Sequence, residues 1–145
     1  MVPWEPALPA LRGRHLRAAT EGNRVKALLV IAHGSPRKEA NEDVRSVAET
    51  IRSRGVFPIV EIGYLDCNEP DIPSAIERCI ELGAEQINAV PYLLHSGKHF
   101  VRDLPEALEQ AAQRHPGVTI LMGDYIGRRP EMLDVIRDRI AEIEK

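Results

Sequence analysis

The chain has few cysteines, few aromatic residues and no long hydrophobic run. Among its 145 residues there are two cysteines, and aromatic side chains make up 4% of the composition. Cys67 and Cys79 are too few for a disulfide framework, and they form no CxxC pair. We therefore expect both to be reduced in a cytoplasmic protein. Since no apolar stretch approaches the roughly 20 residues that span a bilayer, we expect no membrane partner.

Several nucleotide-binding and hydrolase motifs are also missing. The chain contains no G-x-G-x-x-G fingerprint and no P-loop lysine motif, which argues against a dinucleotide or a nucleoside triphosphate as its ligand. The nucleophile elbow G-x-S-x-G is absent, so Ser35 beside His33 gives little support to a serine hydrolase. The net charge of -3 is not that of a basic nucleic-acid-binding protein, and we expect no nucleic-acid partner.

What remains is the composition of an ordinary globular domain, with 43% hydrophobic and 28% charged residues. Residues 1–25 differ from the rest because they are rich in arginine and interrupted by prolines. They contain no uninterrupted apolar segment of the kind found in a signal peptide. We predict a flexible N-terminal extension over residues 1–25 and a single domain over residues 26–145.

Apolar runs alternate with helical patterns along this predicted domain. Short runs rich in apolar and β-branched residues predict strands at 26–32, 57–65, 85–94 and 118–123. Apolar residues at helical spacing predict helices at 39–55, 73–83, 103–115 and 130–145. Strands that alternate with helices imply right-handed crossovers. The sequence thus predicts an α/β fold of three layers, with a mostly parallel four-stranded sheet and helices on both faces.

Three metal-competent side chains, His33, Asp66 and His99, each follow one of the predicted strands. The carboxyl ends of parallel strands form the crevice in which α/β sheets bind ligands, so we expect the three to converge there. Two imidazoles and one carboxylate make an open site suited to Co²⁺, Ni²⁺, Fe²⁺ or Zn²⁺. A structural interpretation stands beside this one, with His33 capping a strand and Asp66 hydrogen-bonding its own turn. The pattern by itself leaves both open.

The other histidines are weaker candidates for a site. His95 and His99 are four residues apart, but Gly97 between them favours a loop, and no H-E-x-x-H motif is present. We treat His95 as a neighbour or bystander of the candidate site. His15 and His115 fall in the N-terminal extension and in a His-Pro-Gly break, and we expect both to be solvated.

A family resemblance is carried by three segments, LLVIAHGSPRKEAN, EIGYLDCNEPDIPSAI and GAEQINAVPYLLHSGKHFVRDLPEAL. Over about residues 27–130, and in matching order, they resemble the CbiX/SirB family of sirohydrochlorin chelatases. The resemblance implies the chelatase fold, a flavodoxin-like parallel α/β sandwich. It also implies insertion of a divalent metal ion into sirohydrochlorin, for cobalamin or sirohaem. The metal, cobalt or iron and by extension nickel, is then a substrate, and no permanent cofactor is implied.

The same resemblance assigns roles to residues. It maps the metal-handling positions onto His33, Asp66 and His99, of which the two histidines are the catalytic bases for the pyrrole protons. The middle position is often Glu in the family, and Asp66 is one methylene shorter. Since the tetrapyrrole carries many carboxylates, we expect the residues that flank the two histidines to contact it. These predicted substrate-binding residues are Ser35, Arg37, Gly97 and Lys98.

A single copy of the domain resembles the short members of the family, which implies a homodimer with its clefts near the interface. Two other interpretations remain open from the sequence. One is a carrier that binds a metal or a tetrapyrrole without catalysis. The other is a flavodoxin-like interaction domain with structural histidines, whose stability would not respond to a metal.

Overall fold

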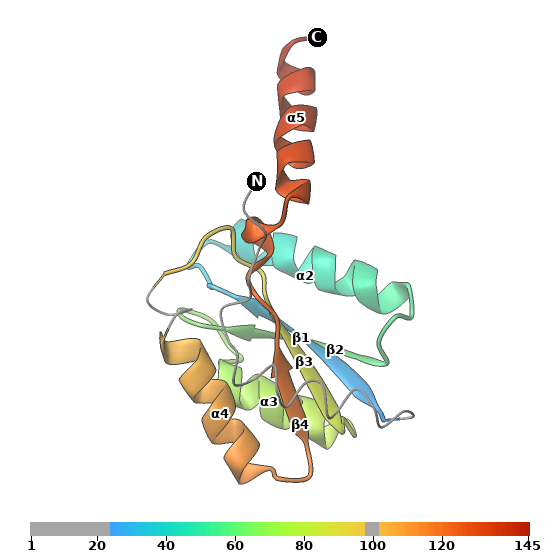
Figure 1. Ribbon diagram of the computed structural model, residues 1–145, viewed down its shortest axis with the longest axis vertical. Helices are drawn as coiled ribbons and strands as arrows, with labels where there is room; N and C mark the ends of the chain where they lie inside the picture. The colour runs from blue at the N-terminus through green and yellow to red at the C-terminus, as the bar shows by residue number, and fades with distance from the viewer. Residues whose placement is uncertain (1–23, 98–101) are drawn as a thin grey trace.

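The computed structural model describes residues 24–97 and 102–145 (Figure 1). Over these residues the chain alternates strands and helices. The strands are β1 (Lys26–Ala32), β2 (Ile59–Tyr64), β3 (Gln86–Pro91) and β4 (Thr119–Met122). The α-helices are α2 (Lys38–Ser53), α3 (Ile72–Glu81), α4 (Leu104–Arg114) and α5 (Glu131–Ile143), and a short 3-10 helix, η2 (Ile126–Arg128), precedes α5. The predicted order of elements is confirmed, with boundaries that differ by a few residues.

The four described strands form one sheet in the order β2-β1-β3-β4, and every pairing is parallel. In the centre of the sheet, Ala27 of β1 lies between Ile59 of β2 and Ile87 of β3. Six of the seven residues of β1 are buried, as expected of a parallel strand covered on both faces. The parallel order brings all the strands' carboxyl ends to one edge of the sheet.

Two apolar cores lie on opposite faces of the sheet. Helices α3 and α4 cover one face, where Leu29, Ile76 and Leu108 are among the fully buried side chains. Helix α2 covers the other face and closes a smaller core around Val30 and Val60. The predicted three-layer α/β fold with helices on both faces is therefore confirmed.

Helix α3 begins at a well-formed N-cap. The Asp71 carboxylate accepts a hydrogen bond from the backbone N–H of Ser74, at 2.9 Å between Oδ1 and N. Hydrogen bonds from the Ser74 side chain and backbone lower the pKa of Asp71 below its usual value. The cap satisfies one of the backbone donors that a helix start leaves open.

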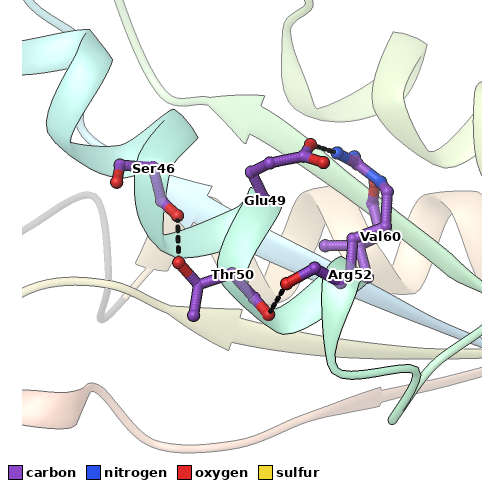
Figure 2. Close-up of polar contacts among 6 residues, drawn as sticks. Ser46, Glu49, Thr50, Arg52 and Val60 are labelled. Carbon is purple, nitrogen blue, oxygen red and sulfur yellow. Dashed lines mark hydrogen bonds and ion pairs between the residues drawn. The ribbon is translucent and has the colours of Figure 1, made fainter.

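Strand β2 is an edge of the sheet, and α2 partly protects it. Figure 2 shows Arg52 reaching from α2 toward Glu49 on the same helix and toward Val60 of β2. The Arg52 guanidinium donates to the Glu49 carboxylate and to the Val60 backbone carbonyl. A charged side chain placed over an edge strand is one means by which proteins block the addition of a further strand.

Helix α5 is the exception to the layered arrangement. The amphipathic pattern over 130–145 correctly predicts a helix, but α5 covers neither face of the sheet. Figure 1 shows it projecting away from the α/β body, and none of its residues is buried.

His115, which we expect to be solvated, is only partly exposed. Only 24% of its side chain is exposed, and its Nε2 lies 2.7 Å from Oε1 of Glu77 on α3. The contact ties the end of α4 to α3. No local pattern could predict this contact, since 38 residues separate the two partners.

The first described residues, Arg24 and Val25, are bonded to the α/β body. Nη1 of Arg24 donates to Oγ1 of Thr119 at 2.6 Å, and the Val25 N–H donates to the Glu85 carboxylate at 3.0 Å. Residues 1–23 and 98–101 lie outside the described residues, so the predicted N-terminal extension over 1–25 stays a prediction. Among the described helices, none is long and apolar enough to cross a membrane.

Candidate functional site

The loops that follow β1 and β2 are joined at the carboxyl edge of the sheet. The Leu65 N–H donates to the Ala32 carbonyl, and the Asp66 N–H donates to the His33 carbonyl, each at 2.9 Å. Two of the three predicted metal-handling residues, His33 and Asp66, therefore sit on backbone segments in direct contact. Both side chains are exposed at this edge.

Gly34 makes this close approach possible. Its φ is +91°, a conformation that L-residues with side chains rarely adopt. A Cβ at this position would lie 1.9 Å from the backbone oxygen of Asp66. The backbone of one loop thus occupies the space that any side chain at residue 34 would need, so the site requires glycine here.

Two asparagines hold the loop around Ser35, and sequence reasoning missed both. Oδ1 of Asn68 accepts the Ser35 N–H at 2.7 Å, and Nδ2 of Asn41 donates to the Ser35 carbonyl at 2.8 Å. Asn41 is buried on α2, in helical register with Val44 and Ala48 of the apolar face. A polar residue within an apolar stripe was the available signal, because a buried amide needs partners. Asn68 carried no comparable signal.

The Asp66 side chain forms a hydrogen bond within its own turn. Its Oδ1 accepts the Cys67 N–H at 2.8 Å, and its carbonyl accepts the Asn68 N–H at 2.8 Å. Cys67 has a φ of +67°, which is unusual for a residue with a side chain. The structural interpretation of Asp66 as a turn residue is therefore correct for one carboxylate oxygen. The carboxylate is nevertheless exposed beside the His33 loop.

The His33 ring also has a local partner. Nδ1 lies 3.2 Å from the carbonyl oxygen of Gly34. A neutral ring with its proton on Nδ1 would donate to that carbonyl and keep Nε2 as its unprotonated nitrogen, the form that binds a metal or accepts a proton. The backbone can thereby select the tautomer that metal handling needs.

Ser35, a predicted substrate-binding residue, also stabilises the backbone of its loop. Its Oγ accepts the Arg37 N–H at 3.1 Å, just before α2 begins. The Arg37 guanidinium is 80% exposed and lies 4.0 Å from the Glu39 carboxylate. Arg37 therefore stays accessible at the edge of the loop. Such a weakly held, exposed ion pair contributes little to stability and can be exchanged for another anion.

The loop after β3 reaches the same edge of the sheet. The Tyr92 N–H donates to the Ile31 carbonyl at 2.7 Å, which fixes the start of this loop beside β1. His95 and Gly97 are exposed. Lys98 and His99 lie outside the described residues, so their predicted roles stay predictions. Within residues 24–97 and 102–145, no three metal-ligating side chains come close enough to hold an ion together.

The connection after β4 supports the loop that leads toward His99. The Gly127 N–H in η2 donates to the Leu93 carbonyl at 3.0 Å. A Cβ on Gly127 would lie 1.8 Å from the backbone oxygen of Leu94. This second glycine contact, also missed from the sequence, fixes the β3–α4 loop against the segment that leads into α5.

A pocket of about 540 Å³ lies beside the edge strand β2, between α2 and α3. Its charged lining is largely paired, since Arg52 contacts Glu49 and Arg78 lies 3.5 Å from Glu61. Neither His33 nor Asp66 lines it. The candidate metal-handling site is therefore the loop cluster at the carboxyl edge and not this pocket.

Comparisons with known proteins agree on one family. Residues 27–143 match the CbiX family model. A sirohydrochlorin cobaltochelatase of Sulfolobus acidocaldarius is 35% identical over 112 residues, which cover 77% of this chain and 87% of that protein. A sirohydrochlorin ferrochelatase of Priestia megaterium is 32% identical over 128 residues, which cover 88% of this chain and 48% of that protein. The chain thus spans about half the length of this ferrochelatase.

Solved structures give the same result. The sirohydrochlorin chelatase SirB from Bacillus subtilis subspecies spizizenii, in complex with cobalt, matches with a TM-score of 0.75 and 33% identity. The match covers 81% of this chain and 50% of that one. A putative cobalamin biosynthesis CbiX protein from Marinobacter aquaeolei matches with a TM-score of 0.68 and 30% identity, covering 81% and 95% of the two chains.

Proposed function

The chain belongs to the CbiX family, and from this premise we propose that it inserts a divalent metal ion into sirohydrochlorin. Cobalt and iron are the metals named for its relatives, and nickel is a further candidate substrate. The observation that carries the proposal is the backbone contact between the His33 and Asp66 loops at the carboxyl edge of the sheet. The contact places the backbones of two residues with metal-binding side chains next to each other, at the edge where parallel α/β sheets bind ligands.

The reaction exchanges two pyrrole protons of the macrocycle for one metal ion. We assign the uptake of these protons to His33 and His99, because an imidazole accepts protons near neutral pH. The two histidines first bind the incoming metal and accept the protons only as the metal passes to the macrocycle, because one ring nitrogen cannot hold both at once. Asp66 ligates the metal or orients a ligand. A metal held opposite the centre of the ring replaces a random encounter with a positioned one. The metal is a substrate in this scheme, and the proposal includes no permanent cofactor.

The tetrapyrrole is held through its carboxylates. We assign this contact to Arg37 and Lys98 as cations beside the two histidines, with Ser35 and Gly97 shaping the adjoining backbone. The exposure of Arg37 and its loose contact with Glu39 support its part in this assignment.

We also propose a homodimer as the working form. The free thiols of Cys67 and Cys79 fit a reducing compartment such as the cytoplasm.

The test is an anaerobic insertion assay. Purified protein is mixed with sirohydrochlorin, and absorbance is followed after addition of Co²⁺, Fe²⁺ or Ni²⁺ in separate runs, each against a run without protein. The proposal predicts insertion faster than the protein-free rate for at least one metal. Binding of the tetrapyrrole without acceleration would instead identify a carrier.

Variants then test the assigned roles. We expect His33→Ala to lower the insertion rate by about 100-fold or more, because it removes a base and a metal ligand together. His95→Ala is the matched control, since this exposed histidine lies in the same edge region without an assigned role. His33→Ala protein that keeps the full insertion rate and the native circular dichroism spectrum would contradict the assignment.

A further inference from the structure

The carboxyl edge of the sheet is wide enough for a tetrapyrrole to extend past its two central strands. The cations of the proposed site, Arg37 and Lys98, follow β1 and β3, which are those central strands. Four adjacent strands are about 14 Å wide. Because a tetrapyrrole carries carboxylates around its whole rim, a ring centred over the middle of this edge directs some of them toward the outer strand β4. A cation beside β4 is therefore expected.

The connection between β4 and α5 has two arginines at this place. Arg128 is the last residue of η2, and Arg129 follows it directly. The Gly127 N–H donates to the Leu93 carbonyl at 3.0 Å, so the backbone just before both arginines is bonded to the loop after β3. Figure 1 shows this connection at the end of the sheet toward which β4 points. Both arginines thus start from the β4 side of the carboxyl edge.

Ion pairing distinguishes the two arginines. Nε and Nη2 of Arg129 donate to the two carboxylate oxygens of Glu131, at 3.1 and 2.8 Å. This bidentate contact already engages Arg129 with a carboxylate of its own chain. The Arg128 side chain is exposed, and no oxygen of the described residues accepts a hydrogen bond from it. Of the two guanidinium groups, that of Arg128 is therefore available to a ligand.

The backbone beside Arg128 presents an apolar side chain. A Cβ on Gly127 would lie 1.8 Å from the backbone oxygen of Leu94, so Arg128 begins one residue away from a close contact with Leu94. The Leu94 side chain is 65% exposed. A small inorganic anion would leave this leucine in water, whereas the face of a macrocycle would cover it and gain from the burial of apolar surface. The combination fits a ligand with an apolar ring and an anionic rim.

We propose that Arg128 binds a carboxylate on the rim of the tetrapyrrole, across the carboxyl edge from Arg37. This inference rests on the proposed function and adds to it a substrate-binding residue on the β4 side. A guanidinium recognises a carboxylate through two parallel N–H donors. The rim carboxylates take no part in the exchange of protons for metal, so the contact is equally strong before and during insertion. It therefore strengthens substrate binding and leaves the turnover of the bound complex unchanged.

The test measures binding apart from catalysis. Metal-free sirohydrochlorin is titrated anaerobically into the wild-type chain and into Arg128→Gln, and binding is followed by absorbance. The titrations are made at about 0.15 M salt, where distant charges are screened. We expect Arg128→Gln to raise the dissociation constant about tenfold, the usual effect of losing a charge-assisted hydrogen bond. Arg128→Lys keeps the charge without the paired donors and should have an intermediate dissociation constant.

The matched control removes the neighbouring guanidinium. In Arg129→Gln/Glu131→Gln the ion pair is lost as a whole, so no carboxylate is left free to bind Arg128. We expect this variant to bind sirohydrochlorin within about twofold of the wild type, because exposed ion pairs contribute little.

Insertion kinetics give a second readout. In Arg128→Gln the KM for sirohydrochlorin should rise with the dissociation constant, while kcat stays within about twofold of the wild-type value. Urea unfolding should be the same as for the wild type, since the side chain is exposed. If Arg128→Gln is less stable, Arg128→Lys decides: an unchanged dissociation constant in a stable Arg128→Lys would count against the paired contact.

The results separate this inference from the proposed reaction. Arg128→Gln protein that binds as tightly as the wild type, or an equal loss of affinity in the control, would overturn the role of Arg128 and leave metal insertion standing. A wild-type chain that binds sirohydrochlorin without inserting a metal would contradict only the reaction, provided that Arg128→Gln still weakens binding. A wild-type chain that does not bind sirohydrochlorin would overturn both.

Discussion

At the scale of single residues, two glycines decide how the loops of the candidate site fit together. Gly34 lets the loop after β1 touch the backbone of Asp66, and Gly127 lets the connection after β4 touch the backbone of Leu94. Neither position is replaceable without movement of the main chain. These close approaches, together with the Asn68 and Asn41 hydrogen bonds to Ser35, place the site-bearing loops relative to one another.

Gly34→Ala is expected to destabilise the protein and to disturb the site. The positive φ alone costs about 1–3 kcal/mol for a residue with a side chain, and the contact with the Asp66 oxygen adds to this. Urea unfolding measures the loss of free energy. Gly117→Ala is the control, because a Cβ there meets nothing within 4 Å. Equal stability of the two variants would contradict the prediction and show that the loops after β1 and β2 can move apart at no cost in free energy.

The two cysteines are expected to differ in reactivity. Cys79 is fully buried, and burial, with a smaller contribution from the charge of Glu61, raises its pKa to about 12. Its thiol therefore stays protonated and inaccessible at neutral pH, whereas Cys67 is exposed. Alkylation followed by mass spectrometry should modify Cys67 alone in the native protein and both cysteines in denaturant. Modification of native Cys79 would contradict its position in the core.

At the scale of elements, the start of α3 depends on a carboxylate whose pKa is lowered. We expect Asp71→Ala to cost about 0.5–2 kcal/mol at neutral pH, the usual worth of an N-cap. Because the pKa of Asp71 is lower in the folded state, its contribution is complete above the unfolded-state pKa and is lost as the pH falls through the folded-state value. Urea unfolding of both proteins at neutral and at acidic pH should show the difference shrinking in acid. A constant difference would contradict the role of the charged cap.

The connection between β4 and α5 offers a second test at this scale. Gly127→Ala places a methyl group against the Leu94 backbone and should displace the loop that leads toward His99. If the proposed reaction is correct, the insertion rate should fall by about tenfold or more, because small misplacements of catalytic groups are costly. Gly123→Ala lies in the same connection with its nearest neighbour at 3.9 Å, and should keep the wild-type rate.

The order of strands and helices could be predicted from sequence because each element carries its own local pattern. The buried run of β1 and the helical spacing of Val44, Ala48 and Ile51 in α2 needed no tertiary information. The contact of His115 with Glu77 and the contact of Asn68 with Ser35 had no such pattern, since each joins distant parts of the chain. The exposure of α5 could not be predicted, because an amphipathic pattern predicts a covered face without saying what covers it.

The candidate site was predicted only in part. The convergence of His33 and Asp66 follows from the parallel sheet, in which β1 and β2 are neighbours. The use of the Asp66 Oδ1 by its own turn was one of two interpretations, and the sequence could not choose between them. The position of His99, outside the described residues, stays a prediction.

At the scale of the whole molecule, the domain is expected to fold without its first 23 residues. Arg24 donates to Thr119 and Val25 donates to Glu85, and the CbiX family model starts at residue 27. A chain that starts at Arg24 should therefore unfold within about 0.5 kcal/mol of the full chain. A chain that starts at Lys26 loses these two hydrogen bonds and the two that the Glu85 and Gln86 N–H groups donate to the Val25 carbonyl, and should be less stable by about 1 kcal/mol or more. Thermal and urea unfolding compare the three; a large loss in the first truncation would place residues 1–23 within the folded domain.

The contact of Gly127 with Leu93 and Leu94 also has a thermodynamic consequence. It makes the β3–α4 loop and the base of α5 parts of one connected segment. A ligand that favours one position of the loop therefore favours one direction of α5. Coupling of this kind is reciprocal: the factor by which a ligand of the loop strengthens the binding of a partner at α5 equals the factor by which that partner strengthens the binding of the ligand.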